Sequence, residues 1–301
     1  IVACLVGSEM CIRDSLRGDR KKLLSFKKIQ NPVTLQVGGS NETELAEACR
    51  ISEQYGYKEI NLNLGCPSKK VQKNKFGACL MQEPKLVARC IESMAKATKL
   101  PITIKTRIGY NDVEDFEFLK SFIQTTKDAG SQKFIIHARK ALLKKLTPKE
   151  NLNIPPLKYD FVYKLKDFFK NDEIIINGGI KTSGDIKNHL KKVDGVMIGR
   201  AIYHSPYFLA EIEREVFGND NIPTRSEVME KLIPYIQEET AKGVQLNHIM
   251  RHTVGLFHGQ NGSRVWKQYL SKNMCIRDAD LKKVNHLMDQ IKKTKIVSLE
   301  R

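Results

Sequence analysis

The sequence predicts an α/β protein: a (β/α)8 TIM barrel that lacks its first two strands, followed by a small all-helical domain. From about residue 30, short apolar segments alternate with amphipathic helical stretches, and strand–helix units in series imply a parallel sheet. No G-x-G-x-x-G motif follows any of these strands, which disfavours a Rossmann fold. After about Pro223 only helical patterns remain.

Six strands are expected in the barrel, each a short apolar or β-branched run. They cover residues 33–37, 59–64, 102–105, 134–137, 174–177 and 196–198. The first helix follows Asn41, which forms a capping-box pattern with Glu44, and Gly56 stops it. Pro84 opens the next helix. Further helical stretches lie around 114–128, 159–170 and 183–192.

The barrel domain is expected to span residues 16–222 and the helical domain residues 223–301. Helices of the second domain are expected at residues 225–242, 246–258, 264–272 and 280–293. Basic residues outnumber acidic residues in both domains.

Composition narrows the class of protein. The 301 residues are 41% hydrophobic, which is ample for a buried core and excludes a disordered chain. No apolar run approaches the ~20 residues of a membrane-spanning helix. The net charge of +17 favours a polyanionic partner, and nucleic acid is the commonest one. A source organism whose proteins are all lysine-rich is the alternative explanation.

Seven scattered cysteines without a C-x-x-C pair favour a reducing cytoplasm and indicate neither a disulfide framework nor a zinc ribbon. Cys49 and Cys90 lie on apolar faces of expected helices and are interpreted as core residues. His248 and His252 have the spacing of a metal pair, but no third ligand is evident. We therefore predict no metal site.

Residues 1–15 are expected to be foreign to the protein. The pentapeptide of residues 10–14 recurs at 274–278 with no repeat period around it, and the surrounding string looks like translated sequencing-adapter sequence. The first segment also lacks the basic start of a signal peptide. About five residues near 274–278 are expected to share this origin.

Polar residues follow all six strands, where the active site of an α/β barrel lies. They are Gln36; Asn63 with Gly65, Cys66 and Pro67; Lys105 with Arg107; His137 with Arg139; Asn177 with Gly178 and Gly179; and Gly199 with Arg200. Strand ends are often polar, but six in succession are what a polar, anionic cofactor requires.

Five of these strand ends carry specific chemistry. Glycines at the last two turns, with Arg200, favour a bound phosphate. Cys66 lies between Gly65 and Pro67 in a tight turn, so its thiol can act as a proton donor or as a nucleophile if a base lies nearby. A purely structural cysteine is the alternative. Lys105 can stabilise negative charge on a cofactor ring, and His137 can hydrogen-bond the same ring.

The ordered motifs resemble the signatures of tRNA-dihydrouridine synthases. They are Asn61–Ser68, Ile104–Gly109, Ile135–Lys140, Ile176–Ile180 and Gly195–Arg200. Residues 146–151 and 154–157 resemble the A subgroup in particular, and the similarity runs from about residue 16 to 301.

This resemblance implies an FMN enzyme that uses NADPH to reduce uridines 20 and 20a in the D-loop of tRNA. Hydride would pass from flavin N5 to uracil C6, and Cys66 would protonate C5. The helical domain would bind tRNA, with the target base flipped into the barrel mouth. The family also implies a cytoplasmic protein that acts as a monomer.

The same resemblance assigns the site residues. Gln36, Lys105 and His137 match residues that hold the isoalloxazine ring. The ribityl and phosphate contacts match Asn177, Gly178, Gly179, Gly199 and Arg200. Asn63 matches a residue near the target nucleotide. The tRNA contacts match Lys149, Arg264 and Lys267, whereas Leu152 replaces a basic residue.

One departure from the family concerns the N-terminus. The family opens with a strand ending in an Ala-Pro-Met type motif that binds FMN, followed by a second strand, and residues 1–15 stand in their place. This chain as printed is therefore expected to bind FMN poorly and to be inactive.

Two alternatives remain open at this stage. A flavin barrel acting on a small pyrimidine, like a dihydroorotate dehydrogenase, would share Lys105 and the phosphate loops but would not need a basic helical domain. A non-catalytic tRNA-binding or RNA-chaperone protein would keep the charge without needing Cys66.

Overall fold

The computed structural model describes residues 2–3, 10–11, 19–27, 30–144, 146–260 and 263–273. The chain divides into two compact units. The first comprises Ile1–Ile180 with Asp185–Ile198, and the second comprises Lys181–Gly184 with Gly199–Arg301. The sequence predicts a boundary near Pro223, whereas the structure groups residues 199–222 with the helical unit.

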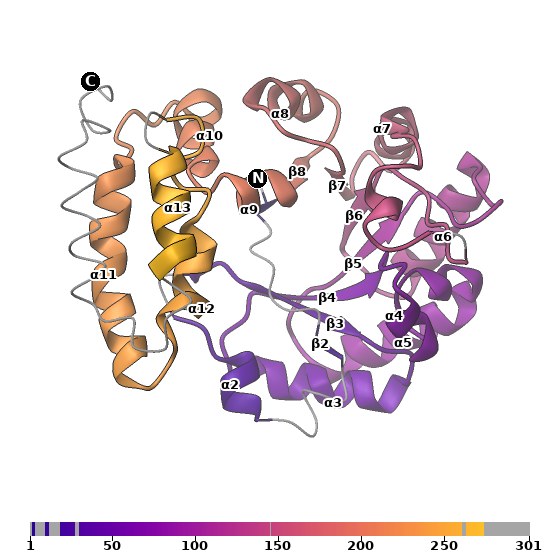
Figure 1. Ribbon diagram of the computed structural model, residues 1–301. Coiled ribbons are helices and arrows are strands. Elements are labelled where there is room, and N and C mark those ends of the chain that lie inside the picture. The colour runs from indigo at the N-terminus through magenta and orange to yellow at the C-terminus, as the bar shows by residue number, and fades with distance from the viewer. Residues whose placement is uncertain are drawn as a thin grey trace. The chain divides into compact units, whose positions relative to one another are not determined.

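Parallel strands build the first unit, and six of them coincide with the predicted ones to within two residues (Figure 1). They are β3 (Thr34–Gly38), β4 (Glu59–Leu64), β5 (Ile102–Arg107), β6 (Lys133–His137), β7 (Glu173–Asn177) and β8 (Gly195–Ile198). Each pairs with the next in chain order. The predicted α/β barrel class is confirmed, and the carboxyl ends of all six strands lie at one end of the sheet.

Two further pairings come from the segment that the sequence predicts to be without strands. β1 (Val2–Ala3) pairs with β8, and β2 (Met10–Cys11) pairs with β3. An unpaired strand edge offers free N–H and C=O groups that any extended backbone can satisfy. The expectation of a sheet with nothing in these two positions is therefore corrected: each position holds a strand of two residues. The foreign origin of residues 1–15 stays a prediction, and residues 274–278 lie outside the described residues.

Helices on the outer face follow the local signals of the sequence. Asn41 caps α3 (Glu42–Glu53) by accepting a hydrogen bond from the Glu44 N–H at 3.0 Å. Pro84 is the first residue of α5 (Pro84–Ala97), which packs against α3 (Figure 1). The other helices of this part are α2 (Arg20–Leu24), α4 (Lys69–Lys73), η2 (Gly77–Gln82), α6 (Phe116–Asp128), η3 (Glu150–Leu152), α7 (Tyr159–Phe168) and α8 (Ser183–Leu190).

Strand register sorts the inner face of the sheet into rows, because side chains two apart along a strand share a face. One row contains Gln36, Asn61, Thr103, Lys133 and Glu173. The next contains Asn63, Lys105, Ile135 and Ile175. The third contains Arg107, His137, Asn177 and Met197. The β3–β5 side of this face is polar, and the β6–β8 side carries a buried apolar cluster of Ile135, Ile175 and Met197.

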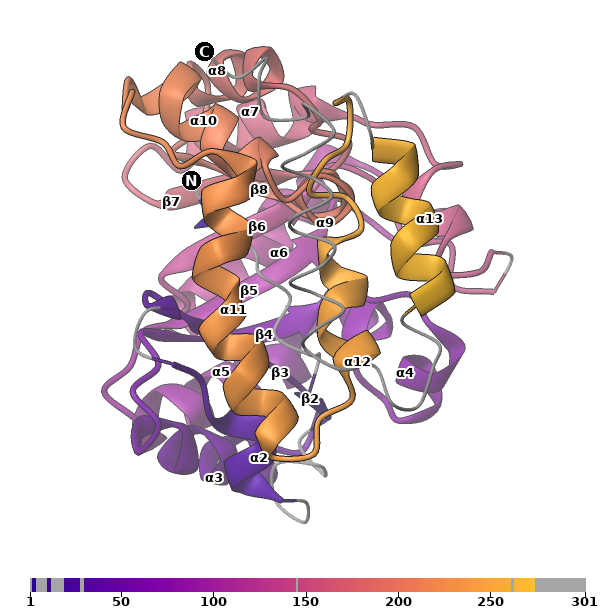
Figure 2. The ribbon, with the colours of Figure 1, turned by 60° about the vertical axis from the view of Figure 1, so that its left-hand side comes forward.

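The second unit is helical around its own core. It contains α9 (Arg200–His204), α10 (Phe208–Phe217), α11 (Arg225–Ala241), α12 (Leu246–Met250), η4 (Arg251–Thr253) and α13 (Ser263–Asn273). Buried side chains from α11, α12 and α13 form one cluster with Phe257, and these helices lie next to one another within the unit (Figure 2). Trp266 is fully buried and donates its indole N–H to the Thr253 carbonyl at 3.0 Å.

The sequence prediction differs from the structure in this unit at α9 and α10, which were not expected, and at the boundary of one expected helix. The helix expected over 246–258 ends at Met250 and continues as a single 3-10 turn. Thr253 contributes to the early end of this helix. Its buried hydroxyl donates to the Met250 carbonyl at 2.8 Å, and its own carbonyl accepts from the Trp266 indole N–H. The helix expected over 280–293 lies outside the described residues. No helix in the described ranges is long and apolar enough to cross a membrane.

Candidate active site

Cys66 lies in a turn that Asn63 organises. The Asn63 side-chain oxygen accepts hydrogen bonds from the N–H groups of Gly65 at 3.0 Å and Cys66 at 3.1 Å. The Cys66 carbonyl in turn accepts from the Ala78 N–H at 2.9 Å, and Ser68 caps α4 immediately afterwards. The Cys66 thiol is half-buried and is presented by a turn fixed on both sides, as the Gly-Cys-Pro sequence predicts.

Arg107, at the end of β5, ties this turn to a second loop. Its Nε donates to the Gly65 carbonyl at 2.8 Å, and its Nη1 donates to the carbonyls of Lys140 at 3.1 Å and Asn151 at 3.2 Å. The side chain is buried, and desolvation lowers the pKa of Arg107 to about 10 although the nearby Cys66 opposes that shift. The guanidinium therefore keeps its charge at neutral pH.

Three further predicted residues share the inner face beside this turn. Lys105 is in register with Asn63, and His137 is in register with both Arg107 and Asn177. His137 is buried, and Asn177 donates its side-chain N–H to the Met197 carbonyl at 2.8 Å. The structure thus groups the Lys105 and Arg107 cations, the His137 imidazole and several amides at the carboxyl ends of neighbouring strands.

Gly178 and Gly179 complete this end of the first unit. Both have positive φ, +117° and +72°. A Cβ on Gly178 would lie 2.7 Å from the His137 ring, and one on Gly179 would lie 2.5 Å from the Leu157 side chain. The Tyr159 hydroxyl fixes the turn by donating to the Gly178 carbonyl at 2.7 Å. Only glycine fits at either position, as a close backbone approach requires.

Other predicted residues lie elsewhere. Gly199, Arg200, Arg264 and Lys267 belong to the helical unit, where the last three are exposed. Gly199 precedes α9, and a Cβ there would meet nothing within 4 Å, so packing does not require its glycine.

The loop after β6 carries Lys149, the remaining predicted tRNA contact, and Leu152, which stands where a basic residue is expected. Lys149 is exposed, and Leu152 is half-buried at the end of η3. Asn151 anchors the loop by accepting from the Leu142 N–H at 2.7 Å and donating to the Leu142 carbonyl at 3.0 Å. Of the neighbouring basic side chains, Lys140 is paired with Glu114 at 3.0 Å.

Two other thiols behave as core residues, as predicted. Burial raises the pKa of Cys49 to about 12 and that of Cys90 to about 11, so both stay protonated at neutral pH. No cluster of three or more His, Cys, Asp or Glu side chains suited to a metal ion occurs within the part of the chain that the structure describes.

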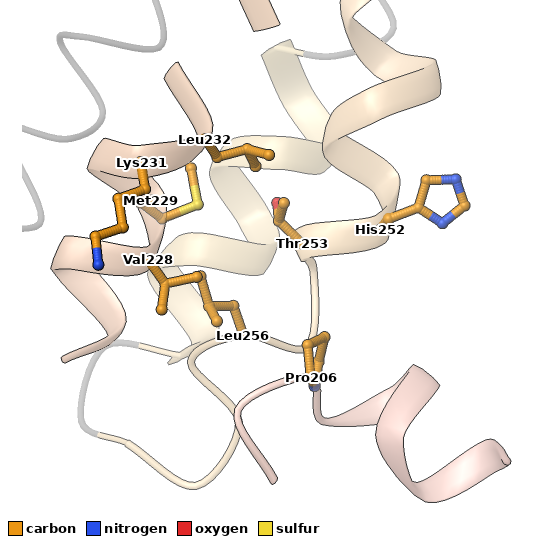
Figure 3. A pocket seen from close by; sticks show the side chains of 8 residues that line it. All are labelled: Pro206, Val228, Met229, Lys231, Leu232, His252, Thr253 and Leu256. Carbon is orange, nitrogen blue, oxygen red and sulfur yellow. The ribbon is translucent and has the colours of Figure 1, made fainter. Parts of the chain in front are cut away.

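A cavity of about 260 Å³ lies within the helical unit, between α11 and the η4 segment. Its wall is mainly apolar, and Figure 3 shows the His252 ring directed away from the side chains of Met229, Leu232 and Leu256. None of the strand-end residues lines it.

Two polar residues of the inner face, Asn61 and Thr103, were not predicted from the sequence as site residues. Both are buried, and both lie in register with Gln36. The signal that could have found them is strand parity: Asn61 is two residues before Asn63, and Thr103 is two before Lys105.

Comparison with known proteins agrees with the grouping. The family model described as "Dihydrouridine synthase (Dus)" matches residues 3–293. A protein of Synechocystis named tRNA-dihydrouridine(20/20a) synthase is 46% identical over 265 residues, covering 88% of this chain and 79% of that protein. A Vibrio cholerae protein of the same name is 43% identical over 289 residues, covering 95% and 88%. The chain belongs to the dihydrouridine synthase family, as its strand-end motifs predict.

Proposed function

We propose that this protein reduces uridine to 5,6-dihydrouridine in the D-loop of tRNA, at positions 20 and 20a, with FMN as cofactor and NADPH as reductant. Family membership supports the reaction, and the shared name of the relatives supports the tRNA positions. The observation that carries the proposal for this chain is the presence of Cys66, Lys105 and His137 at neighbouring carboxyl ends of one parallel sheet.

The polar groups of the first unit fit FMN. Lys105 supplies a cation, and Gln36, His137 and Asn177 supply hydrogen-bonding groups suited to the isoalloxazine ring and ribityl chain. Gly178 and Gly179 leave the room that a Cβ would fill. In the proposed arrangement Gly199 and Arg200 hold the phosphate. Reduced FMN, when bound, supplies the hydride for uracil C6.

Cys66 then holds the proton that uracil C5 requires. Its turn is fixed by Asn63 and Arg107, so the backbone that carries the thiol is in place before substrate arrives. Lys105 places positive charge on the same face, where it stabilises negative charge that develops on a bound ring.

The polyanion in this proposal is tRNA. Lys149 in the barrel unit and Arg264 and Lys267 in the helical unit are exposed, so their positive charges are accessible to a polyanion. The protein is proposed to act in the cytoplasm as a monomer. Two alternatives are disfavoured. A small-pyrimidine reductase would leave the basic helical unit without a role, and a non-catalytic RNA-binding protein would leave Cys66 without one.

The direct test is an assay with purified protein, FMN, NADPH and an unmodified tRNA transcript. Dihydrouridine is measured by mass spectrometry of nuclease fragments, with transcripts in which U20 or U20a is replaced by cytidine as controls. Dihydrouridine at these positions supports the proposal. Product elsewhere corrects the position, and FMN binding without product from any tRNA overturns the reaction.

Gly178→Ala is expected to weaken FMN binding. The added methyl group would lie only 2.7 Å from the His137 ring and would force that ring to move. The affinity, measured by flavin fluorescence titration, should fall about 10-fold or more, because the clash costs about 1–3 kcal/mol and falls on His137, a proposed flavin contact.

Gly130→Ala is the matched control. Gly130 has a similar φ of +109°, but a Cβ there makes only an ordinary 3.5 Å contact with Ala95. This variant should show a similar backbone cost in thermal unfolding and wild-type FMN affinity. Equal FMN affinities for the two alanine variants would contradict a cofactor role for the Gly178 turn.

The double variant Arg264→Glu/Lys267→Glu is expected to weaken tRNA binding with no effect on FMN affinity. Each lost phosphate contact should reduce the slope of log K against log salt by about 0.7–0.9. Lys272→Glu, on the same helix, controls for a change of net charge. Filter binding at several salt concentrations measures the slopes, and parallel slopes for all three proteins would rule out these contacts.

A further inference from the structure

A continuous run of side-chain hydrogen bonds crosses the inner face of the sheet, from the amino end of β4 to the Cys66 turn. Its members are Glu59, Thr103, Asn61, Gln36 and Asn63. All are buried except Gln36, which is half-buried. Three of them are carboxamides, whose two ends differ in chemistry: one accepts and the other donates. The direction of each hydrogen bond therefore decides which end faces which neighbour.

Thr103 sets the direction at the lower end. Its hydroxyl has one proton and lies 3.2 Å from Glu59 Oε1 and 3.5 Å from the Ile60 carbonyl. The carbonyl can only accept, and so can the Glu59 carboxylate, which pairs through Oε2 with the Lys133 ammonium at 2.8 Å. Whichever acceptor takes the proton, the Thr103 oxygen is left to accept.

Asn61 must then donate to Thr103, and it does so from Nδ2 at 2.9 Å. Its other end, Oδ1, faces Gln36 and can only accept, so Gln36 turns its Nε2 toward Asn61, at 2.8 Å. The Gln36 oxygen consequently points toward Asn63.

The upper end of the run demands the same direction independently. Asn63 uses Oδ1 to accept from the N–H groups of Gly65 and Cys66, so its Nδ2 is the end that faces the Gln36 oxygen, at 3.5 Å. The two ends agree at Gln36. A Gln36 carboxamide turned the other way would place its Nε2 against the Asn63 Nδ2 donor and its oxygen against the Asn61 Oδ1 acceptor.

We propose that Thr103 is a positioning residue which, through Asn61, fixes the orientation of the Gln36 carboxamide toward the bound flavin. This rests on the proposed function, because it takes Gln36 as a contact of the isoalloxazine ring. The pyrimidine edge of that ring alternates carbonyl acceptors with an N–H donor, so a carboxamide held at a fixed position along this edge complements it in only one orientation. Thr103 lies in the same row as Gln36 but two strands away, and one row below Lys105, so the proposal gives it no direct contact with substrate or cofactor.

The test compares Thr103→Val with Thr103→Ser. Valine matches threonine in shape but offers Asn61 no acceptor, whereas serine keeps the hydroxyl. Titration of FMN into the apoprotein should show about 3- to 10-fold weaker binding for Thr103→Val, the range expected for one hydrogen bond. Thr103→Ser should restore most of the affinity.

A double-mutant cycle separates positioning from a general structural effect. In a Gln36→Leu background, Thr103→Val should cause no further loss of FMN affinity. An equal loss in both backgrounds would overturn the proposal, as would wild-type affinity in the single Thr103→Val variant.

A second readout does not depend on FMN. The Gln36 side-chain amide signal in a ¹⁵N-resolved spectrum of the apoprotein is assigned by its loss in Gln36→Leu. It should move in Thr103→Val and keep its position in Thr103→Ser. An unmoved signal in Thr103→Val overturns the positioning role. Product formation tests the proposed function separately: a wild-type protein that binds FMN but forms no dihydrouridine overturns that function, and the amide signal then decides the role of Thr103 by itself.

Discussion

Cys66→Ala is expected to slow dihydrouridine formation by about 10²- to 10⁴-fold, the usual contribution of a positioned general acid. The methyl group of alanine has no acidic proton to donate to uracil C5. The turn itself should survive, because its hydrogen bonds run through the Cys66 backbone and the Asn63 side chain. Single-turnover rates with saturating tRNA isolate this step from binding.

Two controls accompany this variant. FMN and tRNA affinities should stay at wild-type values, since no proposed contact with either passes through the thiol. Cys79→Ala removes another half-buried thiol, which lies on η2 and donates to the Phe76 carbonyl, and should leave the rate unchanged. A Cys66→Ala variant with the wild-type rate would show that another group supplies the proton.

The strands were predictable because their signals are local. Apolar runs closed by glycine or proline place six strands within two residues of their observed ends, and Asn41 and Pro84 mark helix starts correctly. The two-residue strands β1 and β2 could not be predicted, because they depend on free edges of distant strands rather than on their own sequence. The α9 and α10 helices were also missed, since no cap or strand pattern separates them from the barrel helices.

The site residues that follow the strands were predictable, because active sites of α/β barrels lie at the carboxyl ends of the strands. Lys105, His137 and Asn177 come together because parallel strands end at one edge of a sheet. The direction of the Gln36 carboxamide could not be predicted, because it follows from the neighbours of Asn61 and Thr103 across three strands. The role of Arg107 was equally hidden, because its acceptors are carbonyl groups, which every residue carries.

Arg107→Met is expected to lower the free energy of unfolding by about 2–4 kcal/mol, because three loop carbonyls lose their donor and part-buried acceptors left unsatisfied cost about 1–3 kcal/mol each. Relief from burying a cation offsets part of this cost. Urea unfolding measures the change. Arg107→Lys keeps the charge but has one nitrogen in place of the two that reach these carbonyls, and should fall between the two proteins. Arg50→Met, at an exposed ion pair with Glu47, should change stability by about 0.5 kcal/mol or less.

The same variant should also affect catalysis, because the Gly65 carbonyl that Arg107 holds immediately precedes Cys66. A displacement of about 1 Å at the thiol can cost about 10²-fold in rate. The rate should be measured well below the melting temperature, so that the folded fraction stays near one. A folded Arg107→Met protein with the wild-type single-turnover rate would show that Asn63 alone positions Cys66. A slow Arg107→Met protein with unchanged FMN affinity would instead show that Arg107 acts by positioning the Cys66 thiol. The flavin contacts proposed for Lys105, His137 and Gly178 do not involve the guanidinium.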